Sequence, residues 1–285
     1  MSFATDILWP VIQDMGTGLG SFMGLNLTDV LRTPQDFSPQ TASLMSTISV
    51  LVVQPVATTV LVVLFVMELW RISMRVEGDS ESFLKIAFFT LVKFALVKWA
   101  FDNTATIMGG LYQLFADMAV DANITVTQAA AVDQTTVTAF LDSVDRMDWL
   151  GQTLLVVLML LAWLVNKGAV IIALALVVMR FVKLYIFTAF APMPMAFFAS
   201  QETRSFAIGF LRNFAATVLQ ALVLVLAFAI YHAISDGWAA RAFEDLDENA
   251  VAAALSIGGN YIFMGVVLGM VMFGSGRIAN ELLGN

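Results

Sequence analysis

The stretch MRFVKLYIFTAFAPMPMAFF, residues 179–198, combines features that conflict in a simple membrane helix. It is almost wholly apolar, yet it opens with Arg180 and Lys183 and carries Pro192 and Pro194 near its end. Proline lacks a backbone N–H, and its ring clashes with the preceding turn, so two prolines break a helix. The stretch therefore predicts an apolar helix that ends where the chain must turn.

The rest of the chain has the composition of a membrane protein. Of its 285 residues, 60% are hydrophobic and 13% are charged, and the mean hydropathy is +0.86. A soluble domain is nearer one quarter charged, and about 20 apolar residues suffice to cross a bilayer as a helix. The expected fold is an all-α, polytopic transmembrane helix bundle.

Five apolar runs predict membrane crossings: residues 44–70, 83–101, 149–183, 206–234 and 252–273. Gln54-Pro55 lies inside the first run and predicts a kink there. Residues 44–285 then form the transmembrane domain, and residues 1–43 form an N-terminal extracytoplasmic segment. Apolar residues at helical spacing within this segment predict an amphipathic helix. Such a helix lies on the membrane or a partner, or packs on the chain's own bundle.

A six-crossing alternative turns the chain at Asn166-Lys167-Gly168 and makes residues 169–190 a separate span. We favour five crossings, because six would leave the first half of this run shorter than a full crossing. With five crossings, residues 184–200 either re-enter the inner half of the bilayer and return, or form a proline kink in an ordinary helix. Non-helical backbone at membrane depth must face protein or a lumen rather than lipid.

The charges between the runs indicate an orientation. With the N-terminus outside and the C-terminus in the cytoplasm, the inner side holds more basic residues than the outer side. The inner ones are Arg71, Arg75, Lys85, Arg180, Lys183, Arg204, Arg212 and Arg277; the outer ones are Arg32, Arg146 and Arg241. The outer loops are instead acidic. We expect a multi-pass membrane protein with its N-terminus outside and its C-terminus inside.

Two lysines lie deep within apolar runs, and both invite two interpretations. A lysine at the bilayer centre costs about 2.5–3.5 kcal/mol on insertion scales. Lys93 either faces the lumen of a pore or pairs with an acid, Glu68 or Asp117, of a neighbouring span. Lys167 marks either a water-filled cavity or a turn. Lys98, by contrast, can pair with Asp102 one helical turn later.

Small residues in the last run predict close helix packing. Gly265 and Gly269 are four residues apart, and Gly258 precedes them by one heptad. Such spacing lets helices approach closely in lipid, within one chain or between subunits. The chain has no cysteine and one histidine. We find no nucleophile–base pair, metal-ligand spacing or phosphate loop, so we expect no cofactor and no enzymatic activity.

The segment LYIFTAFAPMPMAFF (residues 184–198), followed by FLRNFAATVLQALVLVLAFAIYHAI (residues 210–234), resembles the TrbL family, and the resemblance covers about residues 176–235. Members of this family are polytopic inner-membrane subunits of type IV secretion and conjugation machines, and the pattern is similar to members from Gram-positive mobile elements. The resemblance includes the basic Arg212 and the glutamine-bearing span with Gln220.

The resemblance implies a channel or scaffold subunit that assembles as a homo-oligomeric ring. It also implies contact with transient DNA or protein substrate, with other inner-membrane subunits and with cytoplasmic traffic ATPases. Arg180, Lys183, Arg204 and Arg212 would then form an inner basic collar that attracts a polyanion. The positive-inside rule explains the same charges without a substrate.

Two other functions are compatible with the sequence. A small-solute transporter or ion channel would use Lys93, Lys167 and the proline-broken segment as a midplane site. However, no internal repeat is evident, and the spans hold few acids. A membrane scaffold of a phage or contractile-injection system is the third hypothesis.

Overall fold

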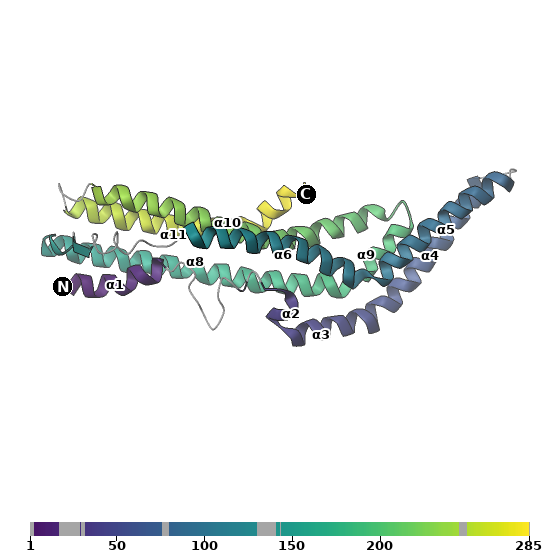
Figure 1. Ribbon diagram of the computed structural model, residues 1–285, viewed down its shortest axis with the longest axis horizontal. Helices are drawn as coiled ribbons and strands as arrows, with labels where there is room; N and C mark the ends of the chain where they lie inside the picture. Colours follow the sequence, from purple (N-terminus) through teal and green to yellow (C-terminus); the bar gives the residue numbers. More distant parts are fainter. Residues whose placement is uncertain are drawn as a thin grey trace. The chain divides into compact units, whose positions relative to one another are not determined.

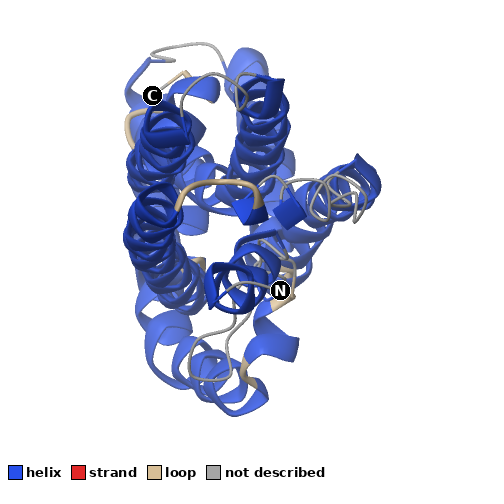
Figure 2. Cartoon of the chain, turned by 90° about the vertical axis from the view of Figure 1, so that its left-hand side faces the viewer, coloured by secondary structure: helices blue, strands red, loops and turns tan. Residues whose placement is uncertain are grey.

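The structure is a computed structural model that describes residues 3–16, 29, 32–75, 80–129, 141–142, 144–244 and 250–284. Every regular element within these residues is helical, which confirms the expected all-α class (Figure 1, Figure 2). The helices are α1 (Phe3–Gly16), α2 (Pro34–Phe37), α3 (Pro39–Ile48), the π-helix η2 (Ser49–Val53), α4 (Gln54–Arg75), α5 (Ser80–Asp102), α6 (Thr104–Ala129), α8 (Trp149–Phe190), α9 (Pro192–Ala196), the 3₁₀ helix η3 (Phe197–Ala199), α10 (Arg204–Glu244) and α11 (Ala250–Leu282).

Four helical stretches of the described chain are long and apolar enough to cross a membrane: Pro39–Met74, Trp149–Phe190, Arg204–Ala227 and Gly258–Leu282. They correspond to the first, third, fourth and fifth predicted spans. The second predicted span forms α5, which is helical but is not among the four. The reason is its charge, because α5 carries Glu81, Lys85, Lys93, Lys98 and Asp102. The protein is a multi-pass membrane protein.

Helix α8 is continuous through Asn166, Lys167 and Gly168, so the turn of the six-crossing alternative is absent. Asn166 does not start a turn because its side-chain amide donates to the Ala162 carbonyl of the same helix, at 3.0 Å. A single glycine costs a helix about 1 kcal/mol relative to alanine, which a long apolar helix tolerates. With 42 residues, α8 is about 63 Å long, twice the thickness of the hydrocarbon core.

The chain forms two compact units. Unit 1 comprises Met1–Leu31, Met118–Met179 and Gln220–Ile278; unit 2 comprises Arg32–Asp117, Arg180–Leu219 and Ala279–Asn285. The longest helices therefore contribute to both units. Each unit has its own set of helix contacts.

The N-terminal helix packs on its own bundle in unit 1. Ala4 and Leu8 of α1 are buried in a cluster with Leu155 and Met159 of α8 and with Val144, just before α8. Of the placements that the sequence left open for the amphipathic helix, the structure shows this one. The apolar face of α1 is therefore buried in the interior of unit 1.

Helices α8 and α11 pack along a glycine seam in unit 1. A Cβ atom at Gly258 would lie 2.5 Å from Leu158 Cβ, one at Gly265 would lie 3.0 Å from Val165, and one at Gly269 would lie 4.0 Å from Ala169. The residue numbers of the contacting pairs increase in the same direction along both helices. The two helices are therefore parallel. The three glycines thus serve packing within the chain. On a neighbouring face of α11, Gln220 of α10 donates to the Ser275 hydroxyl at 3.1 Å.

The glycine seam generates a stability prediction. Gly258→Ala should destabilise the protein by about 1–3 kcal/mol, because the added methyl overlaps Leu158 Cβ and forces the helices apart. Gly259→Ala is the matched control, since nothing lies within 4 Å of its Cβ position. It should be neutral or slightly stabilising, because alanine is the better helix former. Thermal unfolding in a mild detergent measures both, and equal effects would contradict the seam.

Candidate functional site

The four residues of the predicted basic collar do not share one exposed surface. Lys183, Arg204 and Arg212 are exposed, whereas Arg180 is 1% exposed. The prediction placed Arg180 at the surface because basic residues usually end a membrane helix. The structure instead places its side chain inside unit 2, so the exposed part of the collar has three members.

Arg180 joins three helices of unit 2. Its Nε donates to the Thr217 carbonyl of α10 at 3.1 Å. Its guanidinium carbon lies 5.9 Å from the ring centroid of Tyr112 on α6 and 5.3 Å from that of Phe181. Desolvating a charge is expensive, and the aromatic faces and the carbonyl offset part of that cost. Arg180 is therefore a structural cation in this unit.

Two tyrosines beside Arg180 hold the segment that precedes α3. The Tyr112 hydroxyl donates to the Arg32 carbonyl at 2.6 Å, and the Tyr185 hydroxyl donates to the Pro34 carbonyl at 2.6 Å. Phe37 stacks on Phe181, with ring centroids 4.0 Å apart. Our sequence reasoning did not single out these tyrosines. Their phenol groups within apolar helices were the available signal, because a buried hydroxyl needs a hydrogen-bond partner.

The predicted helix-break segment lies between α8 and α10. Helix α8 ends at Phe190, and Pro192 occupies the first turn of α9, where its missing N–H costs nothing. Pro192 is buried and Pro194 is half-buried. Helix α9 and η3 contact both α4 and α5. The APMP sequence thus lies against protein.

Lys93 pairs with an acid, as one of its two interpretations required. Its Nζ lies 3.8 Å from Glu68 Oε1 on α4. Glu68 also binds Arg71 Nη1 at 3.0 Å, and Arg71 Nη2 lies 2.9 Å from Glu202 Oε1 in the turn before α10. These four residues form an ionic chain across α5, α4 and that turn. Lys98 pairs with Asp102, as expected.

Lys167 lies neither in a turn nor alone. It occupies the middle of α8, and its Nζ is 5.8 Å from the ring centroid of Trp163 one turn earlier. A cation over an indole face gains about 0.5–1 kcal/mol when exposed and more when desolvated. The side chain is half-buried.

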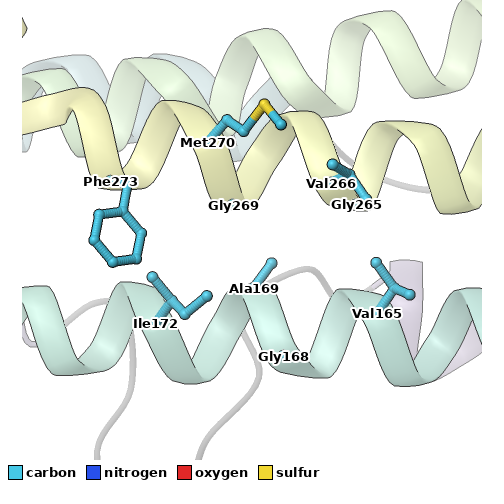
Figure 3. A pocket seen from close by; sticks show the side chains of 9 residues that line it. All are labelled: Val165, Gly168, Ala169, Ile172, Gly265, Val266, Gly269, Met270 and Phe273. Atoms are coloured by element: carbon cyan, nitrogen blue, oxygen red, sulfur yellow. The ribbon is translucent and has the colours of Figure 1, made fainter.

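An apolar groove runs along the contact between α8 and α11 in unit 1 (Figure 3). Its volume is about 390 Å³. The lining residues are Val165, Gly168, Ala169 and Ile172 of α8, and Gly265, Val266, Gly269, Met270 and Phe273 of α11. The glycines and Ala169 leave the space open, and Phe273 and Ile172 face each other at one end. None of these side chains can hydrogen-bond or titrate, so the groove offers no catalytic group.

Metal-binding chemistry has no candidate in the part of the chain that the structure describes. No three histidine, cysteine, aspartate or glutamate side chains of that part come together as ligands. The notable polar features of unit 2 are instead the buried Arg180 and the ionic chain from Lys93 to Glu202.

A protein-family model described as TrbL/VirB6 plasmid conjugal transfer like protein matches residues 23–192. The chain belongs to this family. The family's members are related to type IV secretion, which makes this TrbL/VirB6-type chain a membrane subunit of such a system. The matched region contains the first two predicted spans, α8, Arg180 and Pro192. No curated protein matches the chain.

The family match and the resemblance found in the sequence rest on different parts of the chain. The resemblance drew on residues 176–235, which share only residues 176–192 with the matched region. Family membership is therefore supported mainly by the N-terminal two thirds of this TrbL/VirB6 chain.

The tyrosine contacts generate a local prediction. Tyr185→Phe removes one of two donors to the buried Pro34 carbonyl, which also accepts from the Ser38 N–H at 3.2 Å. The loss should cost about 0.5–1.5 kcal/mol, the net contribution of one hydrogen bond. Amide hydrogen exchange should accelerate in residues 33–38, and Tyr112→Phe should do the same. Exchange in α11 serves as the internal control. Unchanged exchange in residues 33–38 of both variants would contradict this role.

Proposed function

We propose that this TrbL/VirB6 protein is the channel or scaffold subunit of a type IV secretion machine for conjugative DNA transfer. Copies of the chain assemble as a ring in the bacterial cytoplasmic membrane, and the subunit has no enzymatic activity of its own. The family match over residues 23–192 carries this proposal. The four apolar helical stretches support it, because a channel subunit must be embedded in the bilayer.

The charge distribution supports a cytoplasmic C-terminus. Arg71 and Glu202 are in contact, so the end of α4 and the turn before α10 lie at the same end of unit 2. Both positions have an arginine in the sequence, because α4 ends at Arg75 and α10 begins at Arg204. A cluster of arginines at one end favours the cytoplasmic side for that end.

The pairing of Lys93 supports a fifth crossing by α5. This helix has 23 residues, about 35 Å at 1.5 Å per residue, which is enough to cross the hydrocarbon core. Glu68 neutralises its central lysine, which lowers the cost of placing it in the membrane. The same pair weakens one of the three features, with Lys167 and the proline-broken segment, on which the transporter hypothesis drew.

The remaining collar supports contact with a polyanion. Lys183, Arg204 and Arg212 are exposed in unit 2. In a ring, each copy would add three cations, and their summed field would attract phosphates at the cytoplasmic entrance. Arg180 contributes to the position of this surface through Thr217 rather than to contact with DNA.

Isolation of the tagged protein from its native host in mild detergent tests the assembly. We expect a multi-copy complex that contains other inner-membrane secretion subunits and a cytoplasmic traffic ATPase, identified by mass spectrometry. Recovery of a monomer or dimer without these partners would contradict the proposal.

The collar generates a transfer prediction. The triple variant Lys183→Gln, Arg204→Gln, Arg212→Gln should lower conjugation frequency on the order of tenfold, the factor that about 1.4 kcal/mol of lost attraction produces. Arg146→Gln removes a single exposed cation predicted to lie on the other side of the membrane, and it is the control for each of the three single variants of the collar. All of these variants should assemble normally. If Arg146→Gln lowered conjugation frequency as much as the collar variants do, the collar would not be a contact surface for DNA.

A further inference from the structure

Helix α4 begins at a defect in the helical ladder. Pro55 has no N–H to donate to the carbonyl four residues earlier, and its ring would clash with that carbonyl. The preceding turn widens into the π-helix η2, in which the Gln54 N–H donates to the Ser49 carbonyl five residues back. The sequence predicted a kink here. The structure shows the widened turn, a kind of defect that often marks functional positions.

Helix α5 ends at a second defect. Asn103 is a turn residue between α5 and α6, and its backbone remains bonded: its N–H donates to the Trp99 carbonyl and its carbonyl accepts from the Ile107 N–H, both at 3.0 Å. The side-chain amide of Asn103 also donates to the Trp99 carbonyl, at 2.9 Å, and the Thr104 hydroxyl donates to the Phe101 carbonyl at 2.6 Å. The Trp99 carbonyl is thus shared between the backbone N–H and the side chain of Asn103. Side-chain bonds to the carbonyls of the preceding turn slightly destabilise a helix and often bend it.

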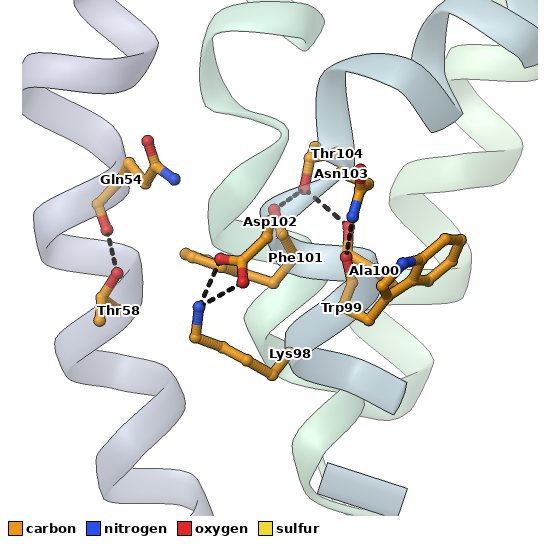
Figure 4. Close-up of polar contacts among 9 residues, drawn as sticks. All are labelled: Gln54, Thr58, Lys98, Trp99, Ala100, Phe101, Asp102, Asn103 and Thr104. Atoms are coloured by element: carbon orange, nitrogen blue, oxygen red, sulfur yellow. Dashed lines mark hydrogen bonds and ion pairs between the residues drawn. The ribbon is translucent and has the colours of Figure 1, made fainter. Parts of the chain in front are cut away.

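The two defects face each other in unit 2. Figure 4 shows Gln54 and Thr58 of α4 opposite the Lys98–Asp102 pair and the turn at Asn103. Beyond this level, α4 and α5 are bound to each other. Phe65 stacks on Phe94 with centroids 3.9 Å apart, and Lys93 pairs with Glu68. The α4–α5 pair is therefore one body with a defect at the base of each helix.

Helices α4 and α5 pack against α9 and η3 in unit 2, and an ionic contact joins the last turns of α4 to the turn before α10. Arg71 of α4 binds Glu202 at 2.9 Å. In the 18-residue apolar window of the Pro39–Met74 stretch 17% is buried, against 61% in that of Arg204–Ala227. Segments with few buried contacts are the ones that open at low free energy.

We propose that the α4–α5 pair is a hinged arm that pivots at Pro55 and Asn103 and is latched against the turn before α10 by the Arg71–Glu202 bridge. Arg71 acts as the latch because its two nitrogens bind acids on both sides of the contact, Glu68 on the arm and Glu202 on the turn. Release moves the arm away from α9 and η3. The inference depends on geometry alone and not on the proposed function.

The size of the motion follows from the length of the arm. Helix α4 has 22 residues, so a rotation of about 15° at Pro55 moves its far end by about 9 Å. An exposed ion pair is weak and is screened by salt. The latch is thus suited to release when a partner or substrate competes for either charge.

The absence of cysteine from the sequence makes a spin-label measurement direct. Spin labels at Met74→Cys on α4 and Ser205→Cys on α10 report the distance between the arm and the turn in the full chain, in detergent or vesicles. Both positions are exposed. The otherwise native chain should give one narrow distance distribution. Glu202→Gln should shift or broaden it by several ångströms toward longer distances.

Two further variants separate a hinge from general loosening. Asp117→Asn removes an exposed carboxylate of unit 2 for which the structure shows no ion pair with the arm, and it should leave the distribution narrow. Pro55→Ala combined with Glu202→Gln should restore much of the narrow distribution, because a continuous α-helix replaces the defect. An unchanged distribution in Glu202→Gln overturns the latch. Broadening that Pro55→Ala does not reduce overturns the hinge.

Discussion

Hydrogen bonding of the backbone in an apolar environment is the constraint on which this structure depends. Where lipid replaces water, every N–H and C=O must find a partner within the protein. Long helices satisfy most of these groups, and side chains form further hydrogen bonds to the backbone where a helix is interrupted. At Asn103 the backbone bonds continue and the Asn103 and Thr104 side chains add to them, and the Thr203 hydroxyl donates to the Phe197 carbonyl beside the proline turn.

The sequence predicted the features that follow from local chemistry. Apolar runs predicted the long helices, Pro55 predicted the defect before α4, and the spacing of Lys98 and Asp102 predicted their pair. For Lys167 the local information left two interpretations, a turn or a cavity, and the structure shows a continuous α8 instead. Glycine and asparagine favour turns in water, but an apolar helix of this length absorbs both.

The features that the sequence could not supply involve contacts between distant segments. Arg180 was placed in a basic collar, because nothing near it in the sequence indicates that Tyr112 and Thr217 surround it. Glu68 was one of two acids proposed for Lys93, and only the fold decides between them. Glu202 as a partner of Arg71 was not foreseen, since the two residues are more than 100 positions apart. Periodicity reports which face of a helix is apolar but not what covers it.

The parallel course of α8 and α11 has a consequence for how the chain enters the membrane. Parallel helices start on the same side, so the acidic segments that precede them, residues 142–148 and 244–248, are delivered to one face of the bilayer. In the orientation proposed above, that face is the outer one. A negative charge gains about 2.3 kcal/mol for each 100 mV when it moves to the positive side of a membrane. The potential of an energised cell would therefore help to draw both segments outward during insertion.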